Sequence, residues 1–342
     1  IRISNNLAEL ETKNLHTYFK TRRGIVKAVN GVSYAIEPGK TLGVVGESGS
    51  GKSVSAMSIL RLLDGNGYVD SGEILFDGKD LTKIPMSEMY HIRGNQISVI
   101  FQEPMTALNP VFSVERQLSE PFIIHRHMSK KQAAEAAVKM LADVKIPNPE
   151  VVVKQYPHQL SGGMRQRVSI AIALACNPKL LIADEPTTAL DVTIQAQILE
   201  LMKELQEKLN TAILLITHDL GIVAEMADRV MIMYAGSIVE SGNCEDIFYH
   251  PAHPYTWGLL GSIPQADQKN KEALISIKGT PPDLHAEITG CPFKHRCSYA
   301  MAVCHEHRPP AFEIGEGHTA CCFLHHEFSP SVINPITREE VK

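Results

Sequence analysis

A glycine-rich stretch near residue 50 constrains the fold of this chain more than any other feature. Gly46–Ser53 reads GESGSGKS and fits the phosphate-binding pattern G-x-x-x-x-G-K-[ST] at every position. The apolar run Thr41–Val45 precedes it, and Val54–Leu63 has helical periodicity. In this context backbone N–H groups and a helix N-terminus can close around an anion. The stretch therefore predicts a nucleoside triphosphate site, not a glycine-rich turn that binds nothing.

Each residue of this loop has an expected part in that site. Lys52 can reach the β- and γ-phosphates, and the Ser53 hydroxyl can ligate Mg²⁺. The other loop residues are expected to offer backbone N–H groups to the phosphates: Gly46, Glu47, Ser48, Gly49, Ser50 and Gly51.

Length and charge limit the class of protein. A chain of 342 residues can bury a large core in one or two domains without disulfides. Its longest apolar run, Val168–Cys176, is about half of the roughly 18 residues that a membrane span needs. A net charge of −5 and the lack of a long basic block argue against a nucleic-acid partner.

The pattern of apolar segments predicts an α/β fold with three parts. Residues 7–45 alternate short apolar runs with turn signals, which is typical of an antiparallel β layer. Helical segments dominate between about residues 105 and 176, so we expect a helical insertion there. Beyond it, Leu180–Asp184 and Ala212–Thr217 are short apolar runs typical of buried parallel strands.

Polar side chains follow several of these strands at the edge where α/β sheets collect ligands. Asp184 is placed to hold Mg²⁺, and Glu185, one residue on, to orient or deprotonate the attacking water. Gln102 ends an earlier strand, where its amide oxygen could coordinate Mg²⁺ or position water. His218 ends a later one and could donate to the γ-phosphate. Taken alone, Gln102 and His218 are more often ordinary structural residues.

Two further features suggest phosphate contacts. Ser161-Gly162-Gly163 directly precedes a helix over about Met164–Cys176, and small residues with free N–H groups at a helix N-terminus can bind an anion. Asp191 lies in a loop that leads into a helix over Thr193–Leu209. On a loop ahead of the glycine stretch, Tyr18 or Phe19 could stack on adenine or simply pack.

Taken together, Gly46–Ser53, Gln102, Leu160–Gln166, Asp184-Glu185, Asp191 and His218 resemble the ordered motifs of the ATP-binding subunit of an ABC transporter. The correspondence is to the Walker A loop, Q-loop, signature motif, Walker B pair, D-loop and switch histidine. The resemblance covers about residues 7–262 and implies a P-loop NTPase domain with Phe19 as the adenine-stacking aromatic.

The same resemblance implies a set of partners and a location. ATP would lie between Lys52 of one subunit and Ser161 of another, in a homo- or heterodimer. This dimer would drive two membrane-spanning permease subunits, with a peptide-binding protein acting indirectly. The chain would be peripheral, at the cytoplasmic face of the cell membrane.

Residues 263–342 are expected to form a small Cys-rich extension. The segments around His250–Thr256, Gly279–Pro282 and Gly290–Cys321 resemble the C-terminal extension of dipeptide/oligopeptide importer ATPases. Cys291, Cys297, Cys304 and Cys321 have the spacing C-x₅-C-x₆-C-x₁₆-C, and four thiolates suit either zinc or a 4Fe–4S cluster. The resemblance favours the cluster, while bare thiols or disulfides remain alternatives.

The sequence thus predicts an ATPase that powers import of dipeptides or oligopeptides. The alternatives are the ATPase of a nickel importer of the same branch and a soluble ABC ATPase outside transport. Coiled-coil insertions or tandem cassettes typical of the soluble class are missing from the sequence.

Overall fold

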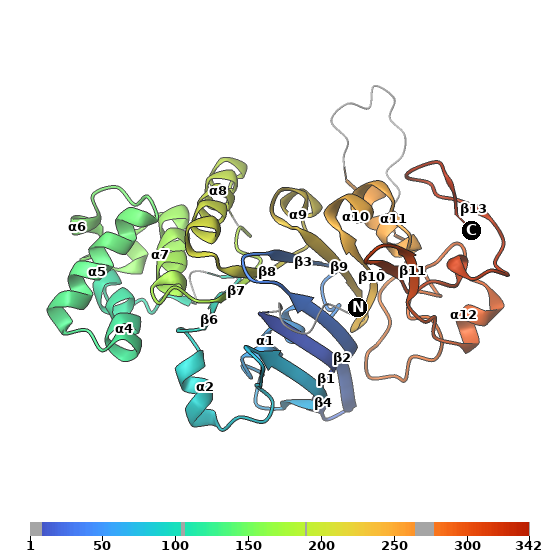
Figure 1. The fold of residues 1–342 in the computed structure, drawn as a ribbon, viewed down its shortest axis with the longest axis horizontal. Helices are drawn as coiled ribbons and strands as arrows, with labels where there is room; N and C mark the ends of the chain where they lie inside the picture. The colour runs from blue at the N-terminus through green and yellow to red at the C-terminus, as the bar shows by residue number, and fades with distance from the viewer. Residues whose placement is uncertain (1–8, 104–106, 189, 264–276, 342) are drawn as a thin grey trace.

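The computed structural model describes residues 9–103, 107–188, 190–263 and 277–341. Its centre is one mixed sheet, whose strands in chain order are β3 (Thr41–Val45), β6 (Ile97–Ile100), β7 (Leu180–Asp184), β8 (Ala212–Thr217), β9 (Arg229–Tyr234), β10 (Ser237–Asn243), β11 (Phe312–Gly315) and β12 (His318–Ala320). Their order across the sheet is β11-β12-β10-β9-β3-β8-β7-β6 (Figure 1).

The middle of this sheet is parallel. Strand β3 pairs in parallel with β8 and β9, and β7 pairs in parallel with β6 and β8. Every residue of β3, β7 and β8 is buried, as expected for parallel strands that are covered on both faces. Because parallel strands end at a common edge, the loops after β3, β6, β7 and β8 meet there.

A second, antiparallel sheet forms another layer. It contains β1 (Leu10–Thr21), β2 (Gly24–Ile36), β4 (Gly67–Phe76) and β5 (Lys79–Asp80), in the order β2-β1-β4-β5. Helix α1 (Lys52–Ile59) packs between the sheets, with Ala56 and Ile59 in one core with Leu10 and Val44. The predicted antiparallel layer is confirmed. Phe19 and Tyr18 were expected on a loop but lie within β1, because its pairing with β4 reaches Phe19 and its pairing with β2 continues to Thr21.

The helical insertion lies at one end of the molecule, on the left in Figure 1. It contains α4 (Val114–Arg126), α5 (Lys130–Asp143), α6 (Pro149–Val152), the 3₁₀ turn η1 (Pro157–Gln159) and α7 (Gly162–Leu174), while α2 (Met86–Ile92) precedes it. Ser129 and Gln132 form a reciprocal capping box that starts α5. The prediction of a helical insertion is confirmed, although residues 105 and 106 of its expected span lie outside the described part.

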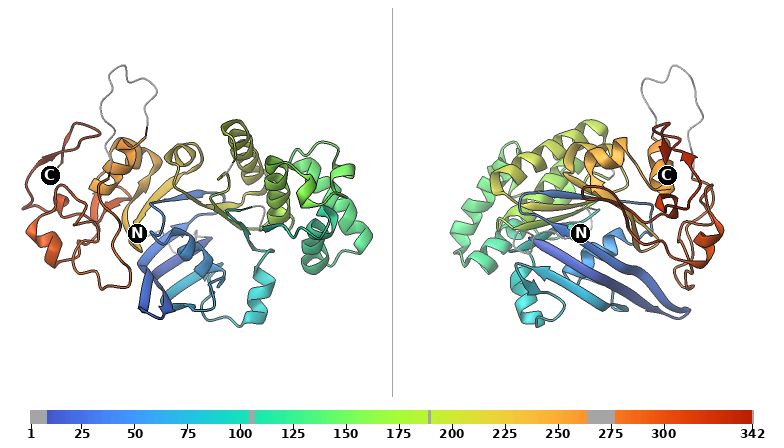
Figure 2. Two further views of the ribbon diagram at one scale, coloured as in Figure 1. Left: turned by 180° about the vertical axis from the view of Figure 1, so that it is seen from behind. Right: turned by 45° about the vertical axis from the view of Figure 1, so that its right-hand side comes forward.

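Helices α8 (Val192–Leu209), α9 (Leu220–Met226), α10 (Cys244–Tyr249) and α11 (Pro254–Gly261) lie on the other face of the main sheet from the antiparallel layer (Figures 1 and 2). The extension then adds α12 (Ala302–Glu306), η2 (Phe323–His325), β13 (Val332–Ile333) and β14 (Glu340–Val341).

The extension is joined to the main sheet by hydrogen bonds. Strand β12 pairs antiparallel with β10, with Glu240 opposite Ala320 and Ser241 opposite Thr319. Phe293 of the extension shares a buried cluster with Val45 and Ile232 of the main sheet. Strands β11 and β12 of the extension therefore continue the main sheet.

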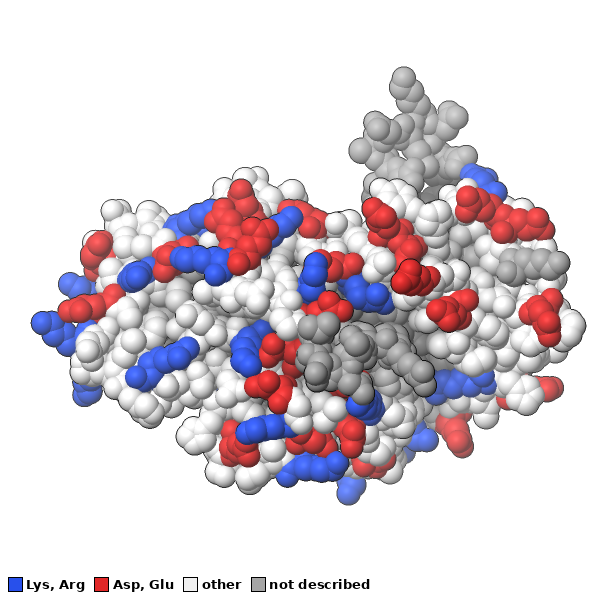
Figure 3. Space-filling model, in the orientation of Figure 1, with Lys and Arg blue, Asp and Glu red and all other residues white. Residues whose placement is uncertain are grey.

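Acidic and basic side chains are intermingled over the face shown in Figure 3. Among the described residues, no helix has both the length and the apolar character that crossing a membrane requires.

Candidate nucleotide site

The phosphate loop turns between β3 and α1, and two of its glycines, Gly46 and Gly51, are required by close backbone contacts. A Cβ atom on Gly46 would lie 2.2 Å from the Met233 carbonyl oxygen. Gly51 has φ +97°, and a Cβ there would lie 2.4 Å from the Ala28 carbonyl oxygen. Side chains at either position would displace the loop from β2 and β9, so the glycine pattern reflects tertiary packing as well as phosphate access.

The loop brings Lys52 and Ser53 to the edge of the parallel strands. Lys52 is buried, with 7% of the residue exposed, and its ammonium donates to the carbonyl oxygens of Gly46 and Glu47 at 2.6 and 3.0 Å. The Ser53 hydroxyl donates to Asp184 Oδ1 at 3.0 Å. This contact joins the loop after β3 to the end of β7.

Glu185 is the centre of a second set of contacts at the same edge. Gln102 Nε2 donates to Glu185 Oε2 at 2.8 Å, and His218 Nδ1 lies 3.0 Å from Glu185 Oε1. Glu185 has φ +47°, a left-handed conformation uncommon for a residue with a side chain. Its backbone N–H nevertheless donates to the Ile216 carbonyl of β8, which fixes the turn. The three residues predicted to act on the γ-phosphate or water thus come together.

Burial and neighbouring charges shift the pKa values of Lys52, Asp184 and Glu185. Burial lowers the pKa of Lys52, against the raising effect of the nearby carboxylates of Glu185 and Asp184. Burial also raises the pKa of Asp184, and the Ser53 hydrogen bond only partly opposes this. Burial acts in the same direction on Glu185, but hydrogen bonds from His218 and Thr188 outweigh it and lower the pKa of Glu185.

Five of the predicted residues, Lys52, Ser53, Gln102, Glu185 and His218, line one open cavity of about 620 Å³. Its lining includes the loop from Glu47 to Val54 together with Gln102, Glu185, Thr188 and His218. The sequence argument missed Thr188, whose hydroxyl donates to Glu185 Oε2 at 2.9 Å. The sequence signal that could have indicated this contact is a hydroxyl residue three positions after Glu185.

Other predicted site residues are not part of this cavity lining. Ser161 accepts from the Met164 N–H as the cap of α7, and Asp191 accepts from the Ile194 N–H as the cap of α8. Gly162 and Gly163 form the first turn of α7, where a Cβ on Gly163 would meet Ile194 at 2.8 Å. Phe19 packs against Gly67, where an added Cβ would lie 2.6 Å from the ring. All five positions therefore lie outside the cavity lining in the single chain.

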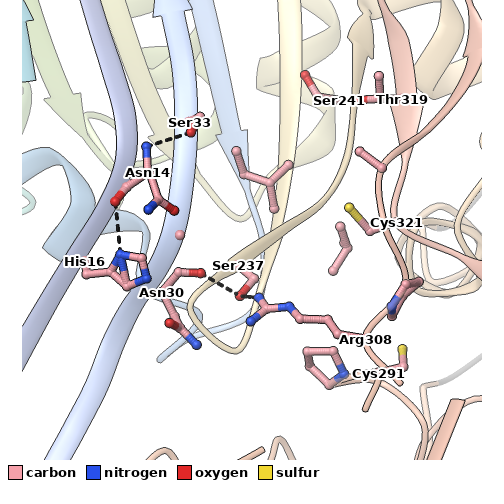
Figure 4. A pocket seen from close by; sticks show the side chains of 16 residues that line it. Asn14, His16, Asn30, Ser33, Ser237, Ser241, Cys291, Arg308, Thr319 and Cys321 are labelled. Carbon is pink, nitrogen blue, oxygen red and sulfur yellow. Dashed lines mark hydrogen bonds between the residues drawn. The ribbon is translucent and has the colours of Figure 1, made fainter. Parts of the chain in front are cut away.

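The four predicted cluster cysteines share one neighbourhood. The Cys291 N–H donates to the Cys304 carbonyl at 2.8 Å, and Cys291, Cys297 and Cys304 belong to one buried cluster. Cys291 and Cys321 both line a cavity of about 470 Å³ between the extension and strands β1 and β2, across from Asn14 and His16 (Figure 4).

This neighbourhood does not form a metal site in the structure. All seven cysteines are free, so no disulfide accounts for the spacing. Across the described ranges, no three His, Cys, Asp or Glu side chains gather closely enough to hold a metal ion. The thiol donors suit iron or zinc, whereas their positions do not match either site.

The fold and the loop geometry define a P-loop nucleoside triphosphatase of the ATP-binding cassette type. Residues 29–188 match the family profile described as ABC transporter. A dimeric solved structure of the ATP-binding cassette MJ0796, in a post-hydrolysis state bound to ADP and Pi, superposes with a TM-score of 0.62 at 28% identity. The match covers 69% of this chain and 98% of that one.

The remaining comparisons cover the extension as well. Residues 239–304 match the profile described as oligopeptide/dipeptide transporter, C-terminal region. The chain is 54% identical to the oligopeptide transport ATP-binding protein OppD of Bacillus subtilis, over 95% of this chain and 91% of that protein. Identity to the dipeptide transport ATP-binding protein DppD of the same organism is also 54%, over 92% and 94%. This chain belongs to the family of ATP-hydrolysing subunits of dipeptide/oligopeptide ABC transporters.

Proposed function

We propose that this chain hydrolyses ATP to power the import of dipeptides or oligopeptides. The observation that carries this proposal is the 54% identity to peptide-transport subunits, which extends over the cassette and the extension. The nickel importer and the soluble ABC ATPase are not favoured, since relatives at 51–54% identity are named for oligopeptide or dipeptide transport.

We assign the chemistry within the cavity by contact. Lys52 and the N–H groups of Gly46–Ser53 bind the phosphates of ATP. Glu185 accepts a proton from the attacking water, and its contacts with Gln102 and His218 support a role for both residues beside the γ-phosphate. The adenine would stack on Phe19, which is half-buried on β1.

Oxygen atoms suited to Mg²⁺ are present at the same edge. The Ser53 hydroxyl and Asp184 carboxylate are adjacent, which fits the oxygen ligands that Mg²⁺ prefers. Gln102 is the third proposed ligand. Bound Mg²⁺ would offset the negative charge of the β- and γ-phosphates.

The positions of Ser161 and Asp191 support a two-subunit site. Both cap helices away from the Lys52 cavity, so we propose that they complete the nucleotide site of a second ATPase subunit, with Gly162 and Gly163 beside its γ-phosphate. The solved cassette is dimeric, which supports this arrangement. The dimer would act on two permease subunits at the cytoplasmic face of the membrane, and a peptide-binding protein would deliver substrate.

We retain two finer proposals for the extension. The first is a division into an ATP-binding domain over residues 1–262 and an extension over 263–342; the segment 264–276 near this boundary lies outside the described residues. The second is a 4Fe–4S cluster on Cys291, Cys297, Cys304 and Cys321, with zinc as the alternative. The thiol donors support this proposal, whereas their positions among the described residues do not form a metal site.

Anaerobic purification followed by assays for iron, labile sulfide and zinc tests the cluster. We expect about four irons per chain, and fewer in Cys297→Ser. Cys244→Ser is the matched control, because Cys244 lies on α10 outside the proposed ligand set. A protein with neither metal would rule the cluster out without affecting the ATPase assignment.

Transport itself is tested by reconstituting the chain with its permease subunits in vesicles. We expect ATP-dependent accumulation of a labelled dipeptide or tetrapeptide, and none with Lys52→Ala. ATP hydrolysis that permeases and peptide leave unchanged would contradict the transport role.

A further inference from the structure

One residue of the extension reaches the phosphate loop. Arg296 Nη1 and Nη2 donate to Glu47 Oε2 and Oε1 at 2.5 and 3.0 Å, a bidentate pair between positions 249 residues apart. The Arg296 side chain is 5% exposed and the Glu47 side chain 31% exposed. Such a planar, two-point contact fixes orientation as well as charge.

The guanidinium is held on all sides. Besides the two bonds to Glu47, it donates to the Tyr234 hydroxyl and to the carbonyl oxygens of Ile277 and Lys278. Its five hydrogen bonds match its five N–H donors, so the group has a single defined position.

The segment that carries Arg296 is anchored in the core. The Arg296 N–H donates to the Phe293 carbonyl, and the Phe293 ring lies 5.2 and 5.4 Å from the rings of Tyr234 and Tyr255. Tyr255 in turn accepts a hydrogen bond from the Glu47 N–H at 2.9 Å. Both the backbone and the side chain of Glu47 are therefore held by residues outside the phosphate loop.

Glu47 poses an electrostatic problem for a nucleotide site. It is a carboxylate within an anion-binding loop and lines the same cavity as Lys52. Without a partner, its charge would repel the triphosphate, because like charges in a partly desolvated site raise the free energy of binding. Pairing with Arg296 makes the two groups neutral together.

We propose that Arg296 is a positioning residue for ATP binding: it neutralises Glu47 and holds the second residue of the phosphate loop, so that the extension completes the nucleotide site of its own chain. This rests on the proposed placement of ATP at Gly46–Ser53. It gives the extension a part in nucleotide binding that does not depend on bound metal.

The test measures the affinity of the full chain for Mg²⁺–AMP-PNP by calorimetry. We expect Arg296→Gln to weaken binding by about fivefold, the effect of one uncompensated unit charge about 4 Å away in a water-like dielectric. Adding Glu47→Gln to that variant should restore most of the affinity, since it removes the exposed charge. Arg296→Lys, which keeps the charge but loses the fork, should fall between Arg296→Gln and the wild type.

Arg308→Gln is the matched control. Arg308 is another arginine of the extension that contacts the ATPase core, but it donates to the Ser237 hydroxyl and not to the loop. The affinity of the Arg308→Gln variant for Mg²⁺–AMP-PNP should equal that of the wild type. If the Arg296–Glu47 ion pair only stabilised the fold, Arg296→Gln would lower the melting temperature and the double variant would not recover affinity. That result would overturn the proposal.

The same series separates this inference from the underlying assignment. If the wild type fails to bind Mg²⁺–AMP-PNP, the nucleotide site itself is wrong. If the wild type binds and Arg296→Gln binds equally well, only the role of Arg296 is wrong.

Discussion

The nucleotide cavity and the cysteine region differ in how far a local motif specifies a three-dimensional site. Both were predicted from spacing, one from GESGSGKS and the other from four cysteines. The nucleotide residues meet because each one ends or follows a strand of the same parallel sheet. The cysteines lie in loops, a short helix and the segment after β12, and they share a neighbourhood without forming a site.

The comparison shows where positional accuracy comes from. A side chain at the end of a buried strand is positioned by the backbone hydrogen bonds of the whole sheet. A thiol in a loop has no such framework, and a metal is the element that usually orders it. Activity should therefore depend on residues at the sheet edge, while folding of the extension depends on its bonds to β10.

Loss of the proposed base should give the largest effect and leave the extension unchanged. Glu185→Gln keeps the size of the side chain but removes the proton acceptor, so ATP hydrolysis should fall by about 10²- to 10³-fold. Steady-state phosphate release measures this, and calorimetry should show that Mg²⁺–AMP-PNP still binds. A variant that hydrolyses ATP at the normal rate would exclude Glu185 as the base.

Replacing the buried carboxylate of Glu240 should instead lower the stability of the protein, not its catalytic rate. Glu240 is 1% exposed and accepts hydrogen bonds from the backbone N–H groups of Ala252 and His253, the Thr256 hydroxyl and His318 Nε2. Glu240→Ala leaves these buried donors without their acceptor, so the free energy of unfolding should fall by about 3 kcal/mol. Urea denaturation measures the loss.

The control for this variant is Glu313→Ala, since Glu313 is exposed on the edge strand β11. It should change stability by less than about 0.5 kcal/mol. Equal losses in the two variants would show that the Glu240 network does not hold the extension to the sheet.

The smallest effect concerns acid sensitivity in the same region. Burial, aided by the charge of His325, lowers the pKa of His253 to about 3. Because the unfolded imidazole titrates near its ordinary 6.5, the unfolded state binds more protons below that pH, and this stability is lost as pH falls. From pH 7 to 5 the contribution amounts to about 2 kcal/mol.

His253→Asn should reduce that slope, because asparagine keeps an acceptor for the Tyr255 N–H but cannot be protonated. Glu240 and His325 are the other titratable groups that contact this segment, so the slope is compared between wild type and variant at each pH. Identical slopes would contradict the assignment to His253.

The sequence by itself determined the elements that obey local rules. The phosphate loop, the helical insertion, the apolar strands ending at Asp184 and Thr217 and the antiparallel layer were all predictable from pattern and spacing. Their physical basis is short-range: glycine conformations, helix caps and hydrophobic periodicity act within a few residues.

Only the tertiary structure decided what lies beside what. It placed Phe19 on a strand, joined β12 to β10, added Thr188 to Glu185 and brought Arg296 to Glu47 across 249 positions. No local pattern marks an arginine as the partner of a glutamate so far away. The pair exists because the aromatic cluster around Phe293 packs the extension against the phosphate loop, and such packing is a property of the whole fold.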